Sequence, residues 1–370
     1  MYPQITTDCG PAEWRNESTQ KPPKQAVSLH DAGAAAILDQ ALQDTAVIWR
    51  GDFHNAKQVL AALKKRLRAK RPSEKNDLTP AERFHRHRMR QAQQSRTVNM
   101  LAVEIGAGFR LELPRAPDVR AALADVYGEE NDTPFLLPLN QLLGFVGAHE
   151  WHKKGVDIPA LGGRIHVPFG VFSPLRGEYL ELLMRAELPP SFQTAFDIGT
   201  GSGVLAALLA KRGLRRITAT DNNPRALSCS GDNICRLGLQ RQIGIEAADL
   251  FPQGCADLIV CNPPWLPAKP TSAVETALYD PDHVMLRGFL NGARSHLNGG
   301  GEVWLIMSDL AEHLGLRAAD FLPRCFQTAG LSLIETLHIR PQHGKAVSTD
   351  DPLAFARNRE TTFLYRLKAG

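Results

Sequence analysis

The sequence predicts a two-domain α/β protein whose C-terminal part contains a doubly wound parallel sheet. Its 370 residues exceed the usual size of a single hydrophobic core. From about residue 165, five short apolar runs alternate with helical or loop segments, which is typical of buried parallel strands. Two further apolar runs, 333–339 and 362–367, are expected to pair antiparallel and bring the sheet to seven strands. A smaller mixed α/β domain is expected to precede this sheet.

The composition indicates a folded cytoplasmic protein that binds no metal and inserts into no membrane. Hydrophobic residues make up 43% and charged residues 22% of the chain, and the net charge is +4. No apolar run approaches the ~20 residues that cross a bilayer. The first residues lack the layout of a signal peptide. The six cysteines form no C-x-x-C pair, and no His/Cys cluster has the spacing of a metal site.

The N-terminal half is expected to have two parts. Residues 1–27 are polar and proline-rich, and we expect them to form a mobile tail. Residues 28–160 are expected to form the smaller substrate-recognition domain. Ser28 is a candidate cap for a helix that extends to Leu42, and apolar spacing predicts another helix over 55–67.

A basic segment lies inside this N-terminal domain. Residues 64–96 contain 12 Lys and Arg but only three acids, Glu74, Asp77 and Glu82. Such an excess neutralises phosphates and favours a nucleic-acid partner, RNA in particular. The alternative is a solvated helix or linker whose charges only maintain solubility. A protein target on the ribosome would also lie beside rRNA, so the charge does not separate an RNA substrate from a protein substrate.

The C-terminal domain is expected to cover 165–370. A helix is predicted over 178–186. The five apolar runs that predict its parallel strands are short and lie between helical or loop segments, at 195–198, 216–220, 244–247, 257–261 and 303–307.

A glycine-rich loop follows the first of these strands. Asp197 ends the strand, and Gly199, Gly201 and Gly203 follow at alternate positions, with Thr200 between the first two. Glycine permits sharp turns and a close approach of ligand to main chain. A dinucleotide fingerprint would need glycine at the sixth position counted from Gly199, and the chain has valine there. The observed spacing is similar to that of loops that bind S-adenosylmethionine, a cation, beside which an acid is favourable.

Further candidates for cofactor binding follow the next two strands. Asp221 ends the second strand, where a carboxylate accepts hydrogen bonds from ribose hydroxyls, and Asn222 could extend that contact. Asp249 follows the third strand and is expected to meet an adenine amino group, with Leu250 or Phe251 covering the ring. The alternative is that Asp221-Asn222-Asn223-Pro224 is a turn that caps the next helix.

The tetrapeptide Asn262-Pro263-Pro264-Trp265 is the candidate catalytic element. It follows the fourth strand, where open α/β sheets place ligands. The prolines fix the backbone. The Asn262 side-chain oxygen and a carbonyl, most plausibly that of Pro263, would accept N–H groups of a planar nitrogen and stabilise its developing charge. Trp265 offers a face for stacking a base or an amide plane. The alternative is a plain turn with a core tryptophan.

Together these motifs resemble those of class I S-adenosylmethionine-dependent methyltransferases that modify planar nitrogens. The resemblance covers roughly 165–370. It is shared by enzymes acting on exocyclic amines of DNA and RNA and by glutamine methyltransferases of release factors and ribosomal proteins. In the latter the fourth motif residue is commonly tyrosine, where this chain has Trp265. By the same resemblance, Pro174 and Arg176 occupy a segment that closes over the cofactor, although a helix N-terminus explains them nearly as well.

The resemblance implies methyl transfer from S-adenosylmethionine on a Rossmann-like fold, with an exocyclic base nitrogen of RNA (rRNA), or of DNA, as the favoured acceptor. The alternatives are glutamine N5 methylation of a release factor or ribosomal protein, a small-molecule acceptor, and a catalytically silent nucleic-acid-binding protein. The N-terminal half, with residues 47–53 before a helix, is similar to the first half of rRNA guanine methyltransferases, a degenerate copy of the catalytic fold.

Overall fold

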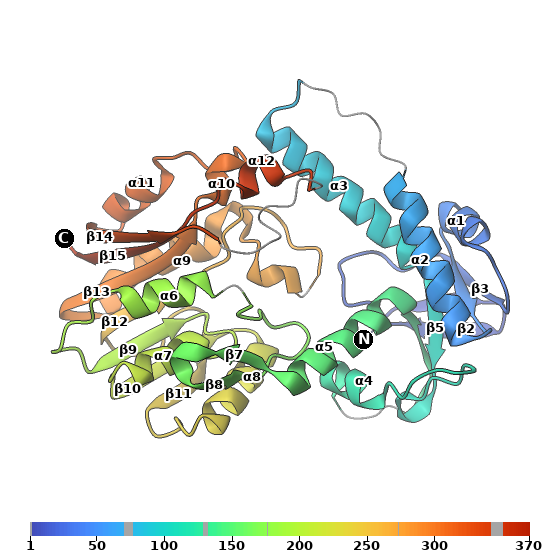
Figure 1. Cartoon of the computed structure of the whole chain (residues 1–370), viewed down its shortest axis with the longest axis horizontal. Coiled ribbons are helices and arrows are strands. Elements are labelled where there is room, and N and C mark those ends of the chain that lie inside the picture. Colours follow the sequence, from blue (N-terminus) through green and yellow to red (C-terminus); the bar gives the residue numbers. More distant parts are fainter. Residues whose placement is uncertain (1, 70–76, 129–131, 176, 273, 342–350) are drawn as a thin grey trace. The chain divides into compact units, whose positions relative to one another are not determined.

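The computed structural model describes residues 2–69, 77–128, 132–175, 177–272, 274–341 and 351–370 (Figure 1). The chain divides into two compact units. Unit 1 comprises Met1–Leu78 and His85–Glu150, and unit 2 comprises Thr79–Phe84 and Trp151–Gly370. None of the helices in the described ranges is long and apolar enough to cross a membrane.

Unit 1 is built on a closed six-stranded barrel. Its strands follow one another around the barrel in the order β1-β2-β6-β5-β4-β3. The pairs β3–β4 and β4–β5 are parallel, whereas β5–β6 is antiparallel. The strands are β1 (Gln4–Thr7), β2 (Gly10–Trp14), β3 (Gln25–Leu29), β4 (Thr45–Trp49), β5 (Leu101–Ile105) and β6 (Phe135–Pro138).

The expectation of a mobile tail over 1–27 is wrong, because this segment supplies three strands of the barrel. Ile5 and Trp14 are 5% and 2% exposed, so the tail contributes to the core despite its polar composition. Ser28 lies in β3 and donates its N–H to Asp8 at 2.9 Å rather than capping a helix. Single inward-facing apolar residues between polar ones hold these short strands in place, a pattern too sparse to recognise along the chain.

The helices of unit 1 pack around this barrel. On α2 the side chains of Phe53, Ala56, Leu60 and Leu63 are buried, which confirms the helix predicted over 55–67. The closed barrel is not a copy of a doubly wound sheet, so the expected resemblance to a degenerate catalytic fold is wrong. The helices are α1 (Ala34–Leu42), α2 (Phe53–Ala69) and α4 (Arg120–Tyr127), with a short 3-10 turn η1 (Ala107–Phe109). Two more helices belong to unit 1 in part, α3 (Pro80–Val98) from His85 on and α5 (Leu139–Lys154) up to Glu150.

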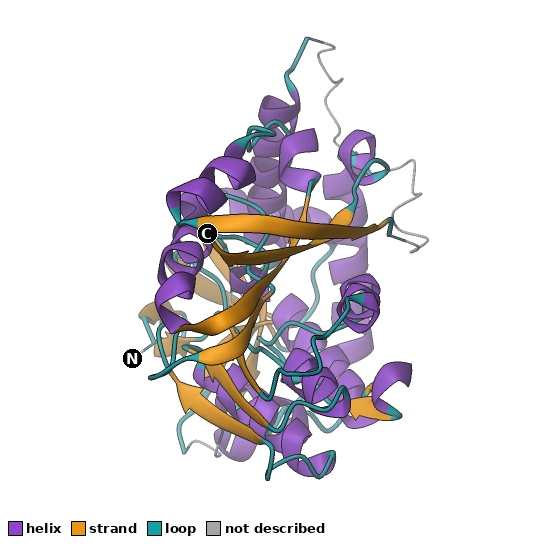
Figure 2. Cartoon of the chain, turned by 90° about the vertical axis from the view of Figure 1, so that its left-hand side faces the viewer, coloured by secondary structure: helices purple, strands orange, loops and turns teal. Residues whose placement is uncertain are grey.

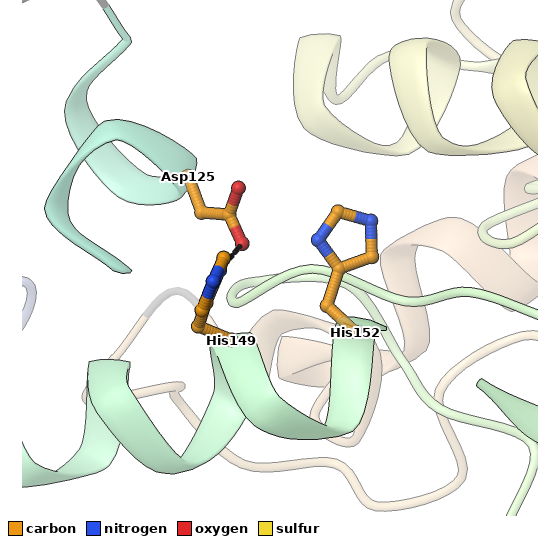
Figure 3. Close-up of side chains that lie close together, drawn as sticks. All are labelled: Asp125, His149 and His152. Carbon is orange, nitrogen blue, oxygen red and sulfur yellow. Dashed lines mark hydrogen bonds and ion pairs between the residues drawn. The ribbon is translucent and has the colours of Figure 1, made fainter. Parts of the chain in front are cut away.

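A histidine–carboxylate pair joins two of these helices. Nδ1 of His149 on α5 lies 2.6 Å from Oδ2 of Asp125 on α4, and both side chains are largely buried (Figure 3). His152 lies one turn farther along α5. The pair fixes α4 against α5 within unit 1.

Unit 2 is built on a seven-stranded sheet, as the sequence predicts. The strand order is β11-β10-β9-β12-β13-β15-β14, and β15 runs antiparallel to the other six strands. Figure 2 shows the strands in orange among the helices. The strands are β9 (Thr194–Ile198), β10 (Arg216–Asp221), β11 (Ile243–Ala247), β12 (Ala256–Cys261), β13 (Leu297–Ser308), β14 (Leu331–Ile339) and β15 (Thr362–Ala369), and a small hairpin of β7 (Val156–Ile158) and β8 (Gly163–Ile165) lies outside the sheet.

Helices cover both faces of this sheet. Successive residues of β12 belong to opposite hydrophobic clusters, Leu258 and Val260 to one and Ile259 and Cys261 to the other. This two-sided burial explains why the strand is a continuous apolar run. The first cluster contains residues of α6 (Glu178–Arg185), α7 (Val204–Lys211) and α8 (Pro224–Arg236), and the second contains residues of α9 (Val284–Ala293) and α11 (Phe321–Thr328).

Shorter segments complete unit 2. They are the helices α10 (Leu310–His313) and α12 (Ala354–Arg357) and the 3-10 turns η2 (Pro159–Leu161), η3 (Val274–Ala277), η4 (Pro281–His283) and η5 (Arg294–His296).

Candidate active site

Three of the predicted site elements begin side by side at the carboxyl edge of the seven-stranded sheet. In the register of the sheet, Ile198 of β9 lies opposite Thr220 of β10 on one side and Cys261 of β12 on the other. The residues that follow these three, Gly199, Asp221 and Asn262, therefore leave the sheet side by side. This is the edge at which open α/β sheets bind their ligands.

The glycine loop has a backbone that only glycine adopts easily. The φ angles of Gly199, Gly201 and Gly203 are +70°, +56° and +80°. Larger residues are strained there. A Cβ atom on Gly203 would also lie 3.1 Å from Ser230 of α8. The alternate spacing of the glycines thus follows from three left-handed residues in one tight turn.

Asp197 is fully buried beneath this loop. Its Oδ2 accepts hydrogen bonds from the Thr200 hydroxyl at 2.7 Å and from the Ala206 amide at 3.0 Å, whereas Oδ1 has no partner among the described residues. The pKa of Asp197 is raised to about 6, chiefly by burial and to a lesser extent by the charge of Asp221, against the opposing effect of these two hydrogen bonds. A buried carboxylate oxygen without a donor suits a cationic ligand. The hydroxyl of Thr200, a candidate cofactor contact, therefore donates its hydrogen bond to Asp197.

Asp221 connects the end of β10 to the glycine loop. Its Oδ2 accepts the Gly201 amide at 3.0 Å, and its Oδ1 accepts the Asn223 amide at 2.9 Å. Each oxygen keeps a second lone pair for a ligand hydroxyl. The cap of α8 is Asn223, which accepts the amide of Arg225 at 3.0 Å, and Asn222 is exposed. The tetrapeptide 221–224 therefore does cap α8, through Asn223, as the alternative predicts.

The candidate adenine contacts in the segment after β11 differ in their exposure and packing. Asp249 is exposed. Leu250 has a φ of +73°, and its carbonyl accepts the Thr220 hydroxyl at 2.6 Å. The Phe251 ring stacks on Phe289 and on His296, with centroid distances of 5.9 and 4.4 Å. Because Phe251 is committed to this packing, Leu250 is the better candidate to cover a bound ring.

The Asn262-Pro263-Pro264-Trp265 turn leaves β12 with its acceptors arranged together. The Trp265 indole N–H donates to Asn262 Oδ1 at 2.9 Å. No donor is recorded on the Pro263 carbonyl within the described ranges. Neither proline can donate a backbone N–H. The turn therefore offers an amide oxygen and a carbonyl to a ligand that carries N–H groups.

The segment expected to close over the cofactor is described only in part. Pro174 is buried, whereas Arg176 lies outside the described residues. Upstream, Gly170 has a φ of +90°, and a Cβ atom there would lie 3.0 Å from the Arg225 guanidinium at the start of α8. The structure thus holds the start of this segment against α8.

One residue that holds the site together, Asn233, does not stand out in the sequence. Its side chain is fully buried on α8. Its Oδ1 accepts the His166 amide at 2.8 Å, and its Nδ2 donates to the carbonyls of His166 at 2.9 Å and Ser202 at 3.0 Å. Asn233 therefore ties the glycine loop to the segment before α6. The one signal in the sequence is an amide on the face that α8 buries, beside Ala226, Cys229 and Ile234.

The described part of the basic segment lies mainly on α2 and α3, and 70–76 lie outside the described residues. Gln94 of α3 donates to the carbonyl of Leu67 on α2 at 3.2 Å, so the two helices are in contact. Arg96 is paired with Asp44 at 2.6 Å. By contrast, the described structure records no ion pair for the exposed cations at the end of α2, which are Lys65, Arg66 and Arg68.

Comparison with known proteins finds similarities for the part of the chain that carries the glycine loop. Residues 163–331 match the family model of the methyltransferase small domain. The chain is 33% identical over 167 residues to the release factor glutamine methyltransferase of Cereibacter sphaeroides, a match that covers 39% of this chain and 59% of that protein. It is 36% identical over 128 residues to the ribosomal RNA small subunit methyltransferase C of Aeromonas hydrophila, covering 33% of this chain and 36% of that protein.

Among solved structures, the ribosomal protein L11 methylase of Lactobacillus delbrueckii subsp. bulgaricus matches with a TM-score of 0.38 and 18% identity, covering 55% of this chain and 84% of that one. The chain spans between about a third and three fifths of the length of the two curated relatives. By sequence, residues 163–331 of this chain are therefore similar to the methyltransferase small domain.

Proposed function

We propose that this protein transfers a methyl group from S-adenosylmethionine to an NH₂ nitrogen of a planar group, in a macromolecule. The observation that carries the proposal is the position of Asn262. Through the β9–β12 register, it leaves the sheet beside Gly199, so the acceptors of the motif adjoin the cofactor loop. The methyl donor supplies an electrophilic carbon on a positively charged sulfur.

The residues of this site fit such a donor. The unpartnered Oδ1 of Asp197 provides negative charge near the glycine loop, and the two oxygens of Asp221 provide acceptors for hydroxyls. Position 199 has no room for a side chain, because a Cβ atom there would lie 2.8 Å from Met285.

The protein would act on the acceptor nitrogen through hydrogen bonds rather than through a general base. Two N–H groups donating to Asn262 Oδ1 and to the Pro263 carbonyl would draw the nitrogen lone pair out of conjugation. Both acceptors stabilise the positive charge that grows on nitrogen during attack. The proton can leave after transfer, so no residue needs to remove it beforehand. Positioning of the acceptor nitrogen against the methyl group would supply the rest of the rate acceleration.

RNA, an rRNA in particular, is the favoured acceptor. Support comes from Lys65, Arg66 and Arg68, exposed cations without recorded ion pairs in the described structure, which supply the charge that RNA phosphates require. The relative in Aeromonas hydrophila is named as an rRNA methyltransferase. Action on rRNA would place the activity in the cytoplasm.

Glutamine methylation of a release factor or ribosomal protein is the second candidate. The relative in Cereibacter sphaeroides is named as a release factor glutamine methyltransferase, and the acceptor chemistry of a glutamine amide is the same. A catalytically silent nucleic-acid-binding protein is the third candidate.

The test uses methyl-labelled S-adenosylmethionine and an extract of cells that lack the protein. Label that nuclease releases would identify a nucleic-acid acceptor, and label that only protease releases would favour glutamine. If the protein binds the cofactor but labels neither fraction, a macromolecular acceptor is ruled out. A small-molecule acceptor or a silent binding protein would then remain.

A further inference from the structure

The catalytic turn contains one internal hydrogen bond between side chains. The indole Nε1–H of Trp265 donates to Oδ1 of Asn262 at 2.9 Å, three residues back along the chain. An indole nitrogen only donates hydrogen bonds, so the atom that it contacts must be the amide oxygen and not the amide nitrogen. This contact fixes which end of the Asn262 amide faces Trp265.

The indole is itself held in place. Trp265 is half-buried and packs against the hydrophobic clusters on both faces of the sheet. The next residue, Leu266, donates to the Leu278 carbonyl at 3.2 Å and accepts the Asp280 amide at 2.9 Å. The Asp280 carboxylate in turn accepts the amides of Met285 and Leu286 at 3.0 Å, at the start of α9. The donor on Trp265 thus belongs to a well-anchored element.

We propose that Trp265 is a positioning residue that orients the Asn262 amide for the acceptor nitrogen. This inference rests on the proposed function. The Asn262 oxygen has two lone pairs, of which the indole uses one, and the other is left for an N–H of the substrate. Without the indole, the amide can turn and present its NH₂ group to the substrate NH₂. Two donors would then face each other, and the stabilisation of the growing charge would be lost.

This role differs from that of a stacking platform. A platform requires the aromatic face of Trp265 and acts independently of Asn262. An orienting donor requires the N–H group and acts only through Asn262. Trp265→Phe keeps an aromatic ring and removes the donor. Replacement by benzothienylalanine keeps the bicyclic shape and exchanges the N–H for sulfur.

The test is a double-mutant cycle on the full chain, with Asn262→Ala as the second change and Trp151→Phe as control. Trp151 is 54% exposed and lies outside the turn. The assay measures transfer of labelled methyl to the extract fraction that the unaltered protein labels. Trp265→Phe and the benzothienylalanine variant should each lower kcat about tenfold, which corresponds to about 1.4 kcal/mol. KM for S-adenosylmethionine should stay the same. In the Asn262→Ala background, the same changes at Trp265 should lower kcat by less than about twofold.

Equal losses in both backgrounds would overturn the inference in favour of stacking, and so would full activity of the benzothienylalanine variant. A second readout does not depend on turnover. The indole N–H proton resonance of Trp265 should move upfield in Asn262→Ala as its hydrogen bond is lost, and an unchanged resonance would also overturn the inference. The two proposals can fail separately. If the unaltered protein labels no acceptor but the Trp265 resonance moves in Asn262→Ala, the proposed function is wrong and the hydrogen bond is confirmed.

Discussion

The carboxylate of Asp221 accepts the backbone amide of Gly201 at 3.0 Å, which joins the end of β10 to the middle of the glycine loop. The same side chain is the candidate ligand for the ribose hydroxyls. One residue therefore shapes the loop and offers the acceptors, so its removal should affect both.

Asp221→Ala should weaken binding of S-adenosylmethionine more than about tenfold, because hydrogen bonds to a charged acceptor each contribute ~1.5–3 kcal/mol. Calorimetric titration measures this directly. Glu246→Ala is the matched control, since that carboxylate is exposed on the neighbouring strand β11. Unchanged affinity in Asp221→Ala would remove this residue from the cofactor site.

Asn262→Ala should lower kcat more than about tenfold while the affinity for S-adenosylmethionine stays nearly intact. Its contacts strengthen only as charge develops on the acceptor nitrogen. The comparison needs kcat from methyl transfer and the dissociation constant from calorimetry on the same preparation. Parallel losses in the two quantities would contradict a role confined to the transition state.

Asp197 should make the stability of the ligand-free protein depend on pH. Its pKa rises from 3.8 to about 6 on folding. The folded state therefore holds this proton more tightly than the unfolded state. The resulting stabilisation is fully present below about pH 4 and is lost as the pH rises through about 6, a change of at most ~3 kcal/mol.

Asp197→Asn cannot ionise at this position, so its stability should not fall as the pH rises through about 6. Between about pH 4 and about pH 7, Tm of the variant should therefore rise relative to Tm of the unaltered protein. Thermal unfolding across this range measures it. A cationic ligand favours the ionised carboxylate, so S-adenosylmethionine should raise Tm of the unaltered protein more at about pH 8 than at about pH 5. A difference in Tm that does not vary with pH would contradict the raised pKa.

Glu302→Ala should destabilise unit 2 by about 3–5 kcal/mol, because it leaves the buried guanidinium of Arg366 without its main partner. Two hydrogen bonds of 2.9 Å join these residues across β13 and β15. Glu335→Ala is the control. Glu335 also contacts Arg366, at 2.7 Å, but its side chain is 47% exposed, and its loss should cost less than about 1 kcal/mol. Denaturant unfolding compares the two, and equal costs would contradict the dominance of the buried pair.

Replacing Lys65, Arg66 and Arg68 by alanine should reduce the salt dependence of RNA binding. Each lost phosphate contact should lower the slope of log K against log salt by roughly 0.7–0.9. Bulk rRNA at several salt concentrations is the probe. Arg120→Ala is the control, because Arg120 is paired with Asp118 at 2.6 Å. If the slope of the triple variant matches that of the control, α2 does not contact the RNA.

Much of unit 2 could be predicted because its pattern is local. Two-sided burial makes the end of β12, 258–261, a continuous apolar run, and three left-handed backbone positions require Gly199, Gly201 and Gly203. The parallel order of the sheet then brings the ends of these strands to one edge. The candidate site follows from motif spacing together with this general property of α/β sheets.

Unit 1 could not be predicted in the same way. Residues 1–27 are proline-rich and polar, and their three strands exist because pairing around the barrel supplies partners for the backbone and buries Ile5 and Trp14. That pairing joins segments far apart in sequence, such as β2 with β6. No local pattern encodes it.

The sequence by itself determined the class of domain, the glycine loop and the catalytic turn, because each depends on residue type at fixed spacing. Only the tertiary structure decided which side chains act on one another: Asp221 on Gly201, Asn233 between two loops, and Trp265 on Asn262. The physical reason is that a hydrogen bond depends on distance and direction in space. Residues 3 to 67 positions apart can meet these requirements only once the chain has folded.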